Sequence, residues 1–316
     1  MKKFKRIIAI SFVCIFLSNL FSIYAVDTND TESISLLTYD CVEGKVVETT
    51  RTFIYDDSIY STPAEYIPNT RAIVSGDGEG DNRFKVNAEL EPYSKTGDIY
   101  LDWDFDHDGT IDRTTHSGTG FMVGPDIMLT AAHVVYWKNS TEWDADAVAS
   151  LDYYADKVYY VTKRNGQYDY EEISESVTVA VPTDYITSVD NETHDWAVVQ
   201  LNTNVGDRTG WFDIGITSGS LNDNYFIVSG YPDDADKQYS QWASTGFVEI
   251  TYSSSFAYAI DTSGGQSGAP VSDSLGTVWG IHVAGGTNYN YAYRFSSSVY
   301  SLIQEKITES LERYSR

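Results

Sequence analysis

The ten residues DTSGGQSGAP, at positions 261–270, place Ser267 among glycines and other small residues. Such a stretch does not hold a regular helix, because each glycine loses more conformational freedom on folding than any other residue. It directly precedes an apolar run that begins at Val271. The stretch is therefore either an ordinary flexible turn or a backbone shaped for close approach to another group, and the rest of the chain has to decide.

The first residues have the pattern of an export signal. A basic start at 2–6 precedes an apolar run at 7–21, and Ala25 ends the segment at a suitable cleavage point. A retained membrane anchor is the alternative. We expect residues 1–25 to be removed and the protein to be secreted to the extracellular space.

Cysteine content and charge limit the fold and the partners. Cys14 leaves with the signal, so Cys41 has no internal partner for a disulfide, and the core or a bound metal must stabilise the exported chain. The chain has 46 acidic and 21 basic residues among its 316. This balance disfavours nucleic acid and anionic membranes as partners, and we expect a monomer that does not bind a membrane after signal removal.

The composition and pattern of the sequence change near residue 72. Residues 26–71 are mixed and polar, and they end in the proline-containing linker STPAEYIPNTR at 61–71. From Ala72 to about residue 296, short runs rich in Tyr, Val, Ile and Thr alternate with Gly, Asn and Asp, and a hairpin is predicted around Asn165–Gly166. This pattern predicts an all-β sandwich or pair of barrels. One helix is expected at about 298–313, with an apolar face at helical spacing: Val299, Leu302, Ile303, Ile307 and Leu311.

Two further motifs offer partners for Ser267. His133 ends the apolar segment GTGFMVGPDIMLTAAH at 118–133, and Asp195 stands in HDWAVVQL at 194–201, just before a predicted buried strand. Taken alone, His133 fits a buried structural histidine and Asp195 fits a strand cap.

Taken together, the three residues fit nucleophilic catalysis. A serine nucleophile needs a base to take its proton, and the base needs a carboxylate to fix its tautomer. The order His133, Asp195, Ser267 differs from the Ser, Asp, His order of α/β-hydrolases and from the Asp, His, Ser order of subtilisins. It is the order found in all-β serine proteases, so the order and the composition agree.

The motifs LTAAHVVY, HDWAVVQL and DTSGGQSGAPV closely resemble those of chymotrypsin-like serine proteases, in particular the bacterial glutamyl endopeptidases. The resemblance implies two six-stranded antiparallel β-barrels with the site between them and a C-terminal α-helix. We expect a propeptide at 26–71 and a protease domain at 72–316, with barrel one at about 72–205 and barrel two at about 206–297.

The resemblance also gives the opening stretch a role. The N–H groups of Gly265 and Ser267 would form an oxyanion hole, and each such donor contributes roughly 3 kcal/mol to stabilising the transition state. Better-known digestive proteases have an aspartate at the position of Gln266, where it pairs with the new N-terminus on activation. Gln266 cannot form that ion pair, so activation must differ here.

The segment APVSDSLGTVWGIHVAGG at 269–286 predicts a hairpin that faces Val271 with Val278 and Ser267 with His282. His282 is either a core histidine bonded to the backbone or part of the primary substrate pocket. Glutamyl endopeptidases carry His and Thr at the positions matching His282 and Thr262, which implies cleavage after Glu and less well after Asp. Asp261 supports the alternative of a trypsin-like pocket for Lys or Arg.

The linker before residue 72 also predicts where the chain is processed. Cleavage at Arg71–Ala72 would place the new amine of Ala72 near the substrate pocket.

The sequence DWDFDHDGTID has the start of an EF-hand-type calcium loop, although Thr115 replaces the final Glu. It predicts either an acidic hairpin or a structural calcium site formed by Asp104, Asp106, Asp108, Thr110 and Asp112. No cofactor is expected for the chemistry, and the expected partners are protein or peptide substrates. A silent secreted binding module and a non-proteolytic hydrolase are the remaining alternatives.

Overall fold

A computed structural model describes residues 31–54, 59–61, 80–105, 108–137, 153–187 and 193–315. The expected signal segment and the bond Arg71–Ala72 lie outside these ranges. None of the helices within them is both long enough and apolar enough to cross a membrane.

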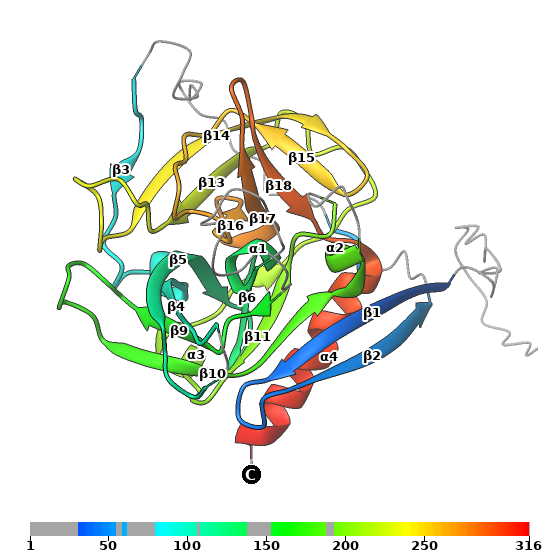
Figure 1. Cartoon of the computed structure of the whole chain (residues 1–316). Helices are drawn as coiled ribbons and strands as arrows, with labels where there is room; N and C mark the ends of the chain where they lie inside the picture. The colour runs from blue at the N-terminus through cyan, green and yellow to red at the C-terminus, as the bar shows by residue number, and fades with distance from the viewer. Residues whose placement is uncertain are drawn as a thin grey trace, which may run out of the picture.

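The first barrel is a closed antiparallel sheet in which β10 and β11 complete the circle (Figure 1). Its strands, in order around the sheet, are β11 (Ala197–Leu201), β6 (Ile127–Thr130), β5 (Arg113–Met122), β4 (Thr96–Trp103), β9 (Lys157–Thr162) and β10 (Glu172–Pro182). Their apolar side chains fill a core that includes Ile99, Phe121, Met128, Val158 and Val199.

The second barrel is closed in the same way by the pairing of β17 with β18. Its strands, in order, are β17 (Thr277–Gly285), β16 (Pro270–Ser272), β13 (Tyr225–Gly230), β14 (Trp242–Thr251), β15 (Ser255–Tyr258) and β18 (Asn290–Arg294). The two six-stranded antiparallel barrels and the C-terminal helix expected from the sequence are confirmed.

The remaining elements are short. Two strands are added to the second barrel, because β12 (Asp213–Ile214) pairs with β17 and β3 (Phe84–Lys85) pairs with β14. β7 (Tyr136–Trp137) and β8 (Tyr153–Tyr154) pair with each other. The short helices are η2 (Tyr93–Lys95), α1 (Ala132–Val135), α2 (Thr183–Thr187) and α3 (Gly206–Thr209).

The hairpin predicted around Asn165–Gly166 exists, but its connection is longer than two residues. β9 ends at Thr162, which pairs with Glu172 at the start of β10. The Asn165 N–H instead bonds the carbonyl of Asp169 within the connecting loop. The predicted hairpin is therefore confirmed, and a longer loop connects its two strands.

Residues 31–54 form a hairpin that the polar sequence did not reveal. β1 (Thr31–Asp40) and β2 (Lys45–Ile54) pair along their full lengths, and β1 extends the first barrel by pairing with residues 178–182 of β10. The hairpin lies beside α4 (Ser297–Tyr314), where Arg51 is 3.1 Å from Glu305 (Figure 1). A large part of the expected propeptide is thus ordered against the barrel.

The C-terminal helix α4 agrees with the apolar spacing of its sequence. Ser296 caps its start by accepting a hydrogen bond from the Val299 N–H, at 3.3 Å. Leu302 and Ile303 are buried against the first barrel, whereas Leu311, which we expected on the same face, is exposed.

Candidate active site

His133 and Asp195 are brought together by the pairing of β6 with β11. The register places Thr130 opposite Ala197, so the chain that leaves β6 runs beside the chain that enters β11. His133 Nδ1 lies 2.6 Å from Asp195 Oδ2, and the His133 main-chain N–H donates to Asp195 Oδ1 at 3.0 Å. Both carboxylate oxygens therefore hold the histidine, one through its ring and one through its backbone.

This pair differs in its contact with solvent. The Asp195 side chain is buried, while 35% of the His133 side chain is exposed. Partial burial lowers the pKa of His133, but the charge of Asp195 and its hydrogen bond outweigh burial, so the pKa is raised above its usual value. The imidazolium form of His133 is therefore stabilised by a carboxylate that water does not fully screen.

Ser267 lies in the loop between β15 and β16, which contains the quoted stretch. Gly265 and Gly268 adopt φ values of +86° and +85°, which disfavour any residue with a side chain. A Cβ atom on Gly265 would lie 2.5 Å from the Tyr231 carbonyl oxygen. Within the described ranges, the N–H groups of Gly265 and Ser267 have no acceptor. The glycines thus permit a backbone that leaves two N–H donors unused.

Thr119 on β5 joins this loop to the first barrel. Its N–H donates to the Ser267 carbonyl at 2.8 Å, and its hydroxyl donates to the Gly265 carbonyl at 2.9 Å. The Thr119 carbonyl accepts the hydroxyl of Thr130, three residues before His133. A short chain of hydrogen bonds therefore connects the serine loop to the segment that carries the histidine.

His282 on β17 borders the same loop through its main chain. Its carbonyl accepts the Gly268 N–H at 2.7 Å, and its N–H donates to the Ala269 carbonyl at 2.9 Å. The predicted register was wrong, since Val271 pairs with Gly280 and a bulge follows before Ser272 pairs with Val278. The shift places His282 opposite the Gly268–Ala269 segment instead of Ser267.

His282 is only 3% exposed, and its ring Nδ1 lies 2.6 Å from the hydroxyl of Tyr258. Burial, together with the neighbouring charge of His133, lowers the pKa of His282 to about 4. His282 is therefore neutral near pH 7.

The two other expected pocket residues differ in accessibility. Thr262 is partly exposed in the serine loop. Asp261 is fully buried, and its Oδ2 accepts the main-chain N–H of Asn82 at 2.7 Å. Ala72 lies outside the described residues, so its expected place near the pocket stays a prediction.

The expected calcium loop connects β4 and β5, and one of its acidic residues, Asp106, lies outside the described residues. Asp104 Oδ2 accepts the Gly109 N–H at 2.8 Å, and Asp108 Oδ1 accepts the Thr110 N–H at 2.7 Å. Asp112 Oδ2 accepts the Phe105 N–H at 2.7 Å. These bonds are those of an acidic turn, and calcium binding stays a prediction.

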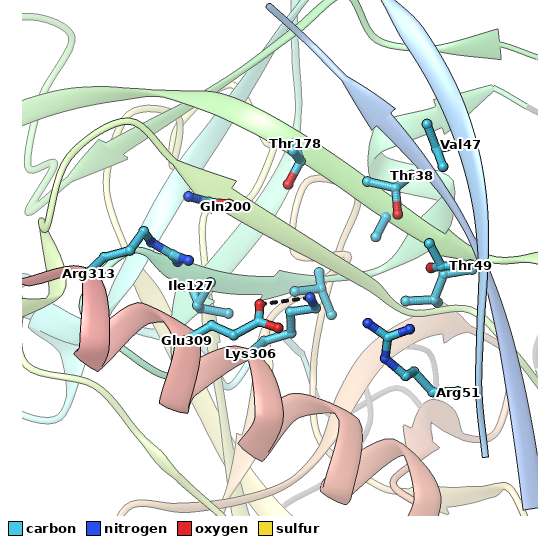
Figure 2. A pocket seen from close by; sticks show the side chains of 13 residues that line it. Thr38, Val47, Thr49, Arg51, Ile127, Thr178, Gln200, Lys306, Glu309 and Arg313 are labelled. Atoms are coloured by element: carbon cyan, nitrogen blue, oxygen red, sulfur yellow. Dashed lines mark hydrogen bonds and ion pairs between the residues drawn. The ribbon is translucent and has the colours of Figure 1, made fainter. Parts of the chain in front are cut away.

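A separate cavity of about 250 Å³ lies between the β1–β2 hairpin, the first barrel and α4 (Figure 2). Its cationic side chains are already paired: Arg51 with Glu305, Lys306 with Glu309, and Arg313 with Asp126. None of the candidate catalytic residues lines it. We interpret it as a packing gap at the junction of the hairpin with the barrel.

Comparison with known families adds independent information. The model of the trypsin-like peptidase domain matches residues 118–281, which include His133, Asp195 and Ser267. The chain belongs to this family. The trypsin-like peptidase domain thus covers parts of both barrels and the loop between β15 and β16.

Individual relatives agree with this assignment. The chain is 30% identical over 202 residues to a glutamyl endopeptidase of Bacillus licheniformis, a match that covers 60% of this chain and 59% of that protein. It is equally identical, over the same length, to a protein of Bacillus subtilis named an extracellular metalloprotease, covering 60% and 58%. A solved structure of a Glu endopeptidase superposes with a TM-score of 0.57 at 25% identity, covering 73% of this chain and 98% of the other. The chain spans about three fifths of the length of these curated relatives.

Sequence patterns did not identify three residues that contact the predicted site residues. Thr119 holds the serine loop, Tyr258 contacts the His282 ring, and Arg83 lies 3.3 Å from the side chain of Gln266. Each contact joins residues at least 24 positions apart, and those of Thr119 and Arg83 span more than 140. No local motif contains both partners of such a contact, so only the fold reveals them.

Proposed function

We propose that this protein is a serine endopeptidase whose nucleophile is Ser267. The contact between His133 Nδ1 and Asp195 Oδ2 is the observation that carries the proposal. A carboxylate on Nδ1 keeps the proton there, which leaves Nε2 free to accept the proton of a serine hydroxyl. The hydrogen bonds from Thr119 to the serine loop support the assignment of Ser267 as that serine.

The reaction then follows the acyl-enzyme route. Ser267 Oγ attacks the peptide carbonyl while His133 takes the hydroxyl proton, and the same proton later goes to the leaving amine. Water then attacks the acyl-enzyme while His133 takes its proton, and the acid product leaves as Ser267 regains its hydroxyl proton. Because Asp195 raises the pKa of His133, activity should fall as the pH drops through that raised value, when the base becomes protonated.

The free N–H groups of Gly265 and Ser267 are the proposed oxyanion donors. Charge moves onto the carbonyl oxygen as the tetrahedral intermediate forms, and N–H groups already aimed at that position stabilise it without rearrangement. The positive φ of Gly265 supports this role, since it sets the orientation of the Gly264–Gly265 peptide plane, which carries the Gly265 N–H, relative to the chain that follows.

We further propose cleavage after Glu, and less well after Asp. A buried substrate carboxylate needs hydrogen-bond donors or positive charge. A neutral His282 supplies one donor when Tyr258 bonds its Nδ1 and the proton resides on Nε2. The Thr262 hydroxyl and a freed amine at Ala72 would add two more.

The trypsin-like alternative is less well supported. It requires Asp261 to meet a substrate Lys or Arg, but this carboxylate is fully buried and already accepts the Asn82 N–H. The relatives named glutamyl endopeptidases also favour the acidic specificity.

The relatives named a glutamyl endopeptidase and an extracellular metalloprotease support a secreted enzyme that acts on proteins or peptides. We propose that residues 1–25 and 26–71 are removed in turn, which leaves a chain beginning at or near Ala72. Terminal sequencing of active enzyme tests this step, and a terminus at Val26 would contradict it.

Replacing Ser267 with alanine tests the function directly. Ser267→Ala should lower kcat on the order of 10⁶-fold without changing the melting temperature by more than a few degrees, because the residue acts as part of a unit with His133. A defined protein is digested with both forms and the new termini are sequenced. Ser274→Ala, in the exposed turn after β16, is the matched control. Cleavage by Ser267→Ala at the parental rate would disprove the mechanism, and new ends after Lys or Arg would reverse the specificity.

A further inference from the structure

The segment at 81–86 lies against the loop that carries Ser267. The Asn82 N–H donates to Asp261 at 2.7 Å, and the Val86 N–H donates to the Gln241 carbonyl at 3.0 Å. Between them, β3 pairs with β14. This stretch begins about ten residues after the predicted maturation bond. It pairs with the second barrel, although in the sequence it comes before the strands of the first barrel.

Arg83 is the charged residue of this segment that reaches the loop. Its side chain is only 6% exposed, and ion pairs at 2.8 Å to Asp81 and Asp234 compensate its charge. The same guanidinium donates to the Ser263 hydroxyl and lies 3.3 Å from Gln266 Oε1. A planar group with five N–H donors can serve several acceptors at once, which a lysine ammonium cannot do in the same geometry.

Gln266 stands between the two proposed oxyanion donors. Its side chain is fully buried, and its Oε1 also accepts the Ser263 N–H at 3.0 Å. Its Nε2 donates to the Trp242 carbonyl at 3.4 Å. Because the peptide units on either side of Gln266 carry the N–H groups of Gln266 and Ser267, fixing this side chain restricts the orientation of the neighbouring amides.

We propose that Arg83 is a positioning residue that holds Ser263 and Gln266, which flank Gly264 and Gly265, and thereby keeps the Gly265 and Ser267 amides in their donor orientation. The proposal rests on the proposed function. Arg83 belongs to the interior of the chain and not to a newly formed terminus. The loop therefore has its catalytic shape before residues 26–71 are removed, and processing changes access or pocket charge instead of building the oxyanion hole.

A double-mutant cycle tests the link between Arg83 and Gln266. Arg83→Met and Gln266→Met should each lower kcat for a Glu-containing ester substrate about 100-fold, as for loss of an oxyanion donor, with KM changed less than about threefold. The double variant should lose little more than either single variant, since both changes break the same link. Phosphonylation by a small fluorophosphonate should slow by a similar factor.

Arg294→Met is the matched control. Like Arg83, Arg294 has a guanidinium that donates several hydrogen bonds. Its acceptors are the main-chain carbonyls of Gly219 and Tyr252, away from the serine loop. The Arg294→Met variant should have a lower melting temperature, but its kcat should fall by no more than about threefold. The positioning role would be overturned if the losses in the two single variants multiplied in the double variant. A parental kcat in Gln266→Met would also overturn it, and this second test holds even if Arg83→Met fails to fold.

The uncut chain provides the second arm. Full-length protein with Arg71→Gln, verified by intact mass, should react with the fluorophosphonate within about threefold of the processed enzyme. A reaction more than 100-fold slower would overturn the claim that the loop is formed before processing. If the parent enzyme is not labelled, or Ser267→Ala is labelled equally, the proposed function itself fails. Normal labelling of Arg83→Met with none of Ser267→Ala rejects only the role of Arg83.

Discussion

Two histidines near the serine loop, the buried His282 and the partly exposed His116, have different charge states. His282 Nδ1 contacts the hydroxyl of Tyr258, and burial lowers the pKa of His282 to about 4. His116 lies between two carboxylates, with Nε2 at 2.6 Å from Asp98 and Nδ1 bonded to Asp233. Burial also lowers the pKa of His116, but its bonds to these carboxylates outweigh that effect and raise the pKa to about 10. The partners, and not burial alone, decide which histidine is charged.

The region around His282 can receive the negative charge of a substrate carboxylate, whereas the charges around His116 already balance one another. The imidazolium of His116 and the guanidinium of Arg164, 2.8 Å from Asp98, balance the two carboxylates there. A substrate carboxylate gains nothing from a histidine that is already paired. His282 has a hydroxyl partner, so a carboxylate next to it does not compete with another anion for that bond. We therefore propose that the region of His282 recognises the substrate and that the region of His116 supports the loop.

Between these two regions, the largest expected effect comes from the contact of the serine loop with the region of His116. In Gly265→Ala, the new Cβ would lie 2.8 Å from the Asp233 N–H and 3.0 Å from His116 Cε1, at a φ of +86°. The loop must move, and the loss of an aligned oxyanion donor should lower kcat by about 10³-fold. Steady-state kinetics on a Glu-containing ester substrate measures this change.

Gly276→Ala is the control for backbone strain. Gly276 has a φ of +83°, but its nearest neighbour is the Pro92 Cβ at 3.9 Å, so the added methyl has space. It should lose stability and keep its kcat. Equal kcat values for Gly265→Ala and Gly276→Ala would show that the close packing beside His116 does not support the loop.

A smaller effect is expected in the neutral region. His282→Ala should lower kcat/KM for cleavage after Glu by ~10²-fold, because the substrate carboxylate loses a charge-linked hydrogen bond of roughly 3 kcal/mol. Tyr258→Phe leaves the ring in place but removes its hydroxyl partner, so it should lose about tenfold. Both variants are compared on substrates that differ only in Glu or Gln before the cleaved bond.

Reaction with a small organophosphate serves as the control, since it does not use the substrate pocket. Both variants should react at near the parental rate. Equal losses on the Glu and Gln substrates would show that His282 supports the fold and does not recognise the acid. If Asp261→Asn instead abolished all cleavage after basic residues, the trypsin-like assignment would replace ours.

The sequence indicated the fold class better than the surroundings of the candidate site. Alternating patterns predicted an all-β sandwich or pair of barrels and a terminal helix, while the two six-stranded barrels were implied only by the resemblance of the motifs around His133, Asp195 and Ser267 to those of chymotrypsin-like proteases. The β1–β2 hairpin was missed because β2 is largely exposed and β1 buries only Ile34 and Leu36, which is too short an alternation to mark a strand pair. The hairpin at His282 was shifted by two positions, because the turn places Ser272 opposite Val278, one position from the predicted pairing, and a bulge between Val271 and Ser272 adds a second shift.

The charged support of the loop could not be predicted for a different reason. Arg83 lies 183 residues from Gln266, and His116 lies 117 residues from Asp233. Each of these side chains fits a solvated surface position when it is considered in its own segment. Their function in positioning follows only from the meeting of the two barrels and the segment at 81–86.

The smallest effect, and the most direct test of the two charge states, is the dependence of stability on pH. The folded-state pKa of His282 lies below the unfolded value of 6.5, so between pH 4 and 6.5 the unfolded chain binds the extra proton and stability rises with pH. The folded-state pKa of His116 lies above 6.5, so from pH 6.5 to about 10 the folded chain holds the extra proton and stability falls as pH rises.

Replacing each histidine with glutamine should therefore flatten opposite ends of the stability profile. His282→Gln should reduce the loss of melting temperature on acidification between pH 6.5 and 4, while His116→Gln should reduce the loss between pH 6.5 and 10. The comparison uses Ser267→Ala as the background, because self-digestion would otherwise obscure unfolding. The sign of each change matters more than its size, since other groups titrate in both windows. If His116→Gln left the alkaline limb as steep as in the parent, His116 would not be charged between Asp98 and Asp233. The contrast between the two regions would then be lost.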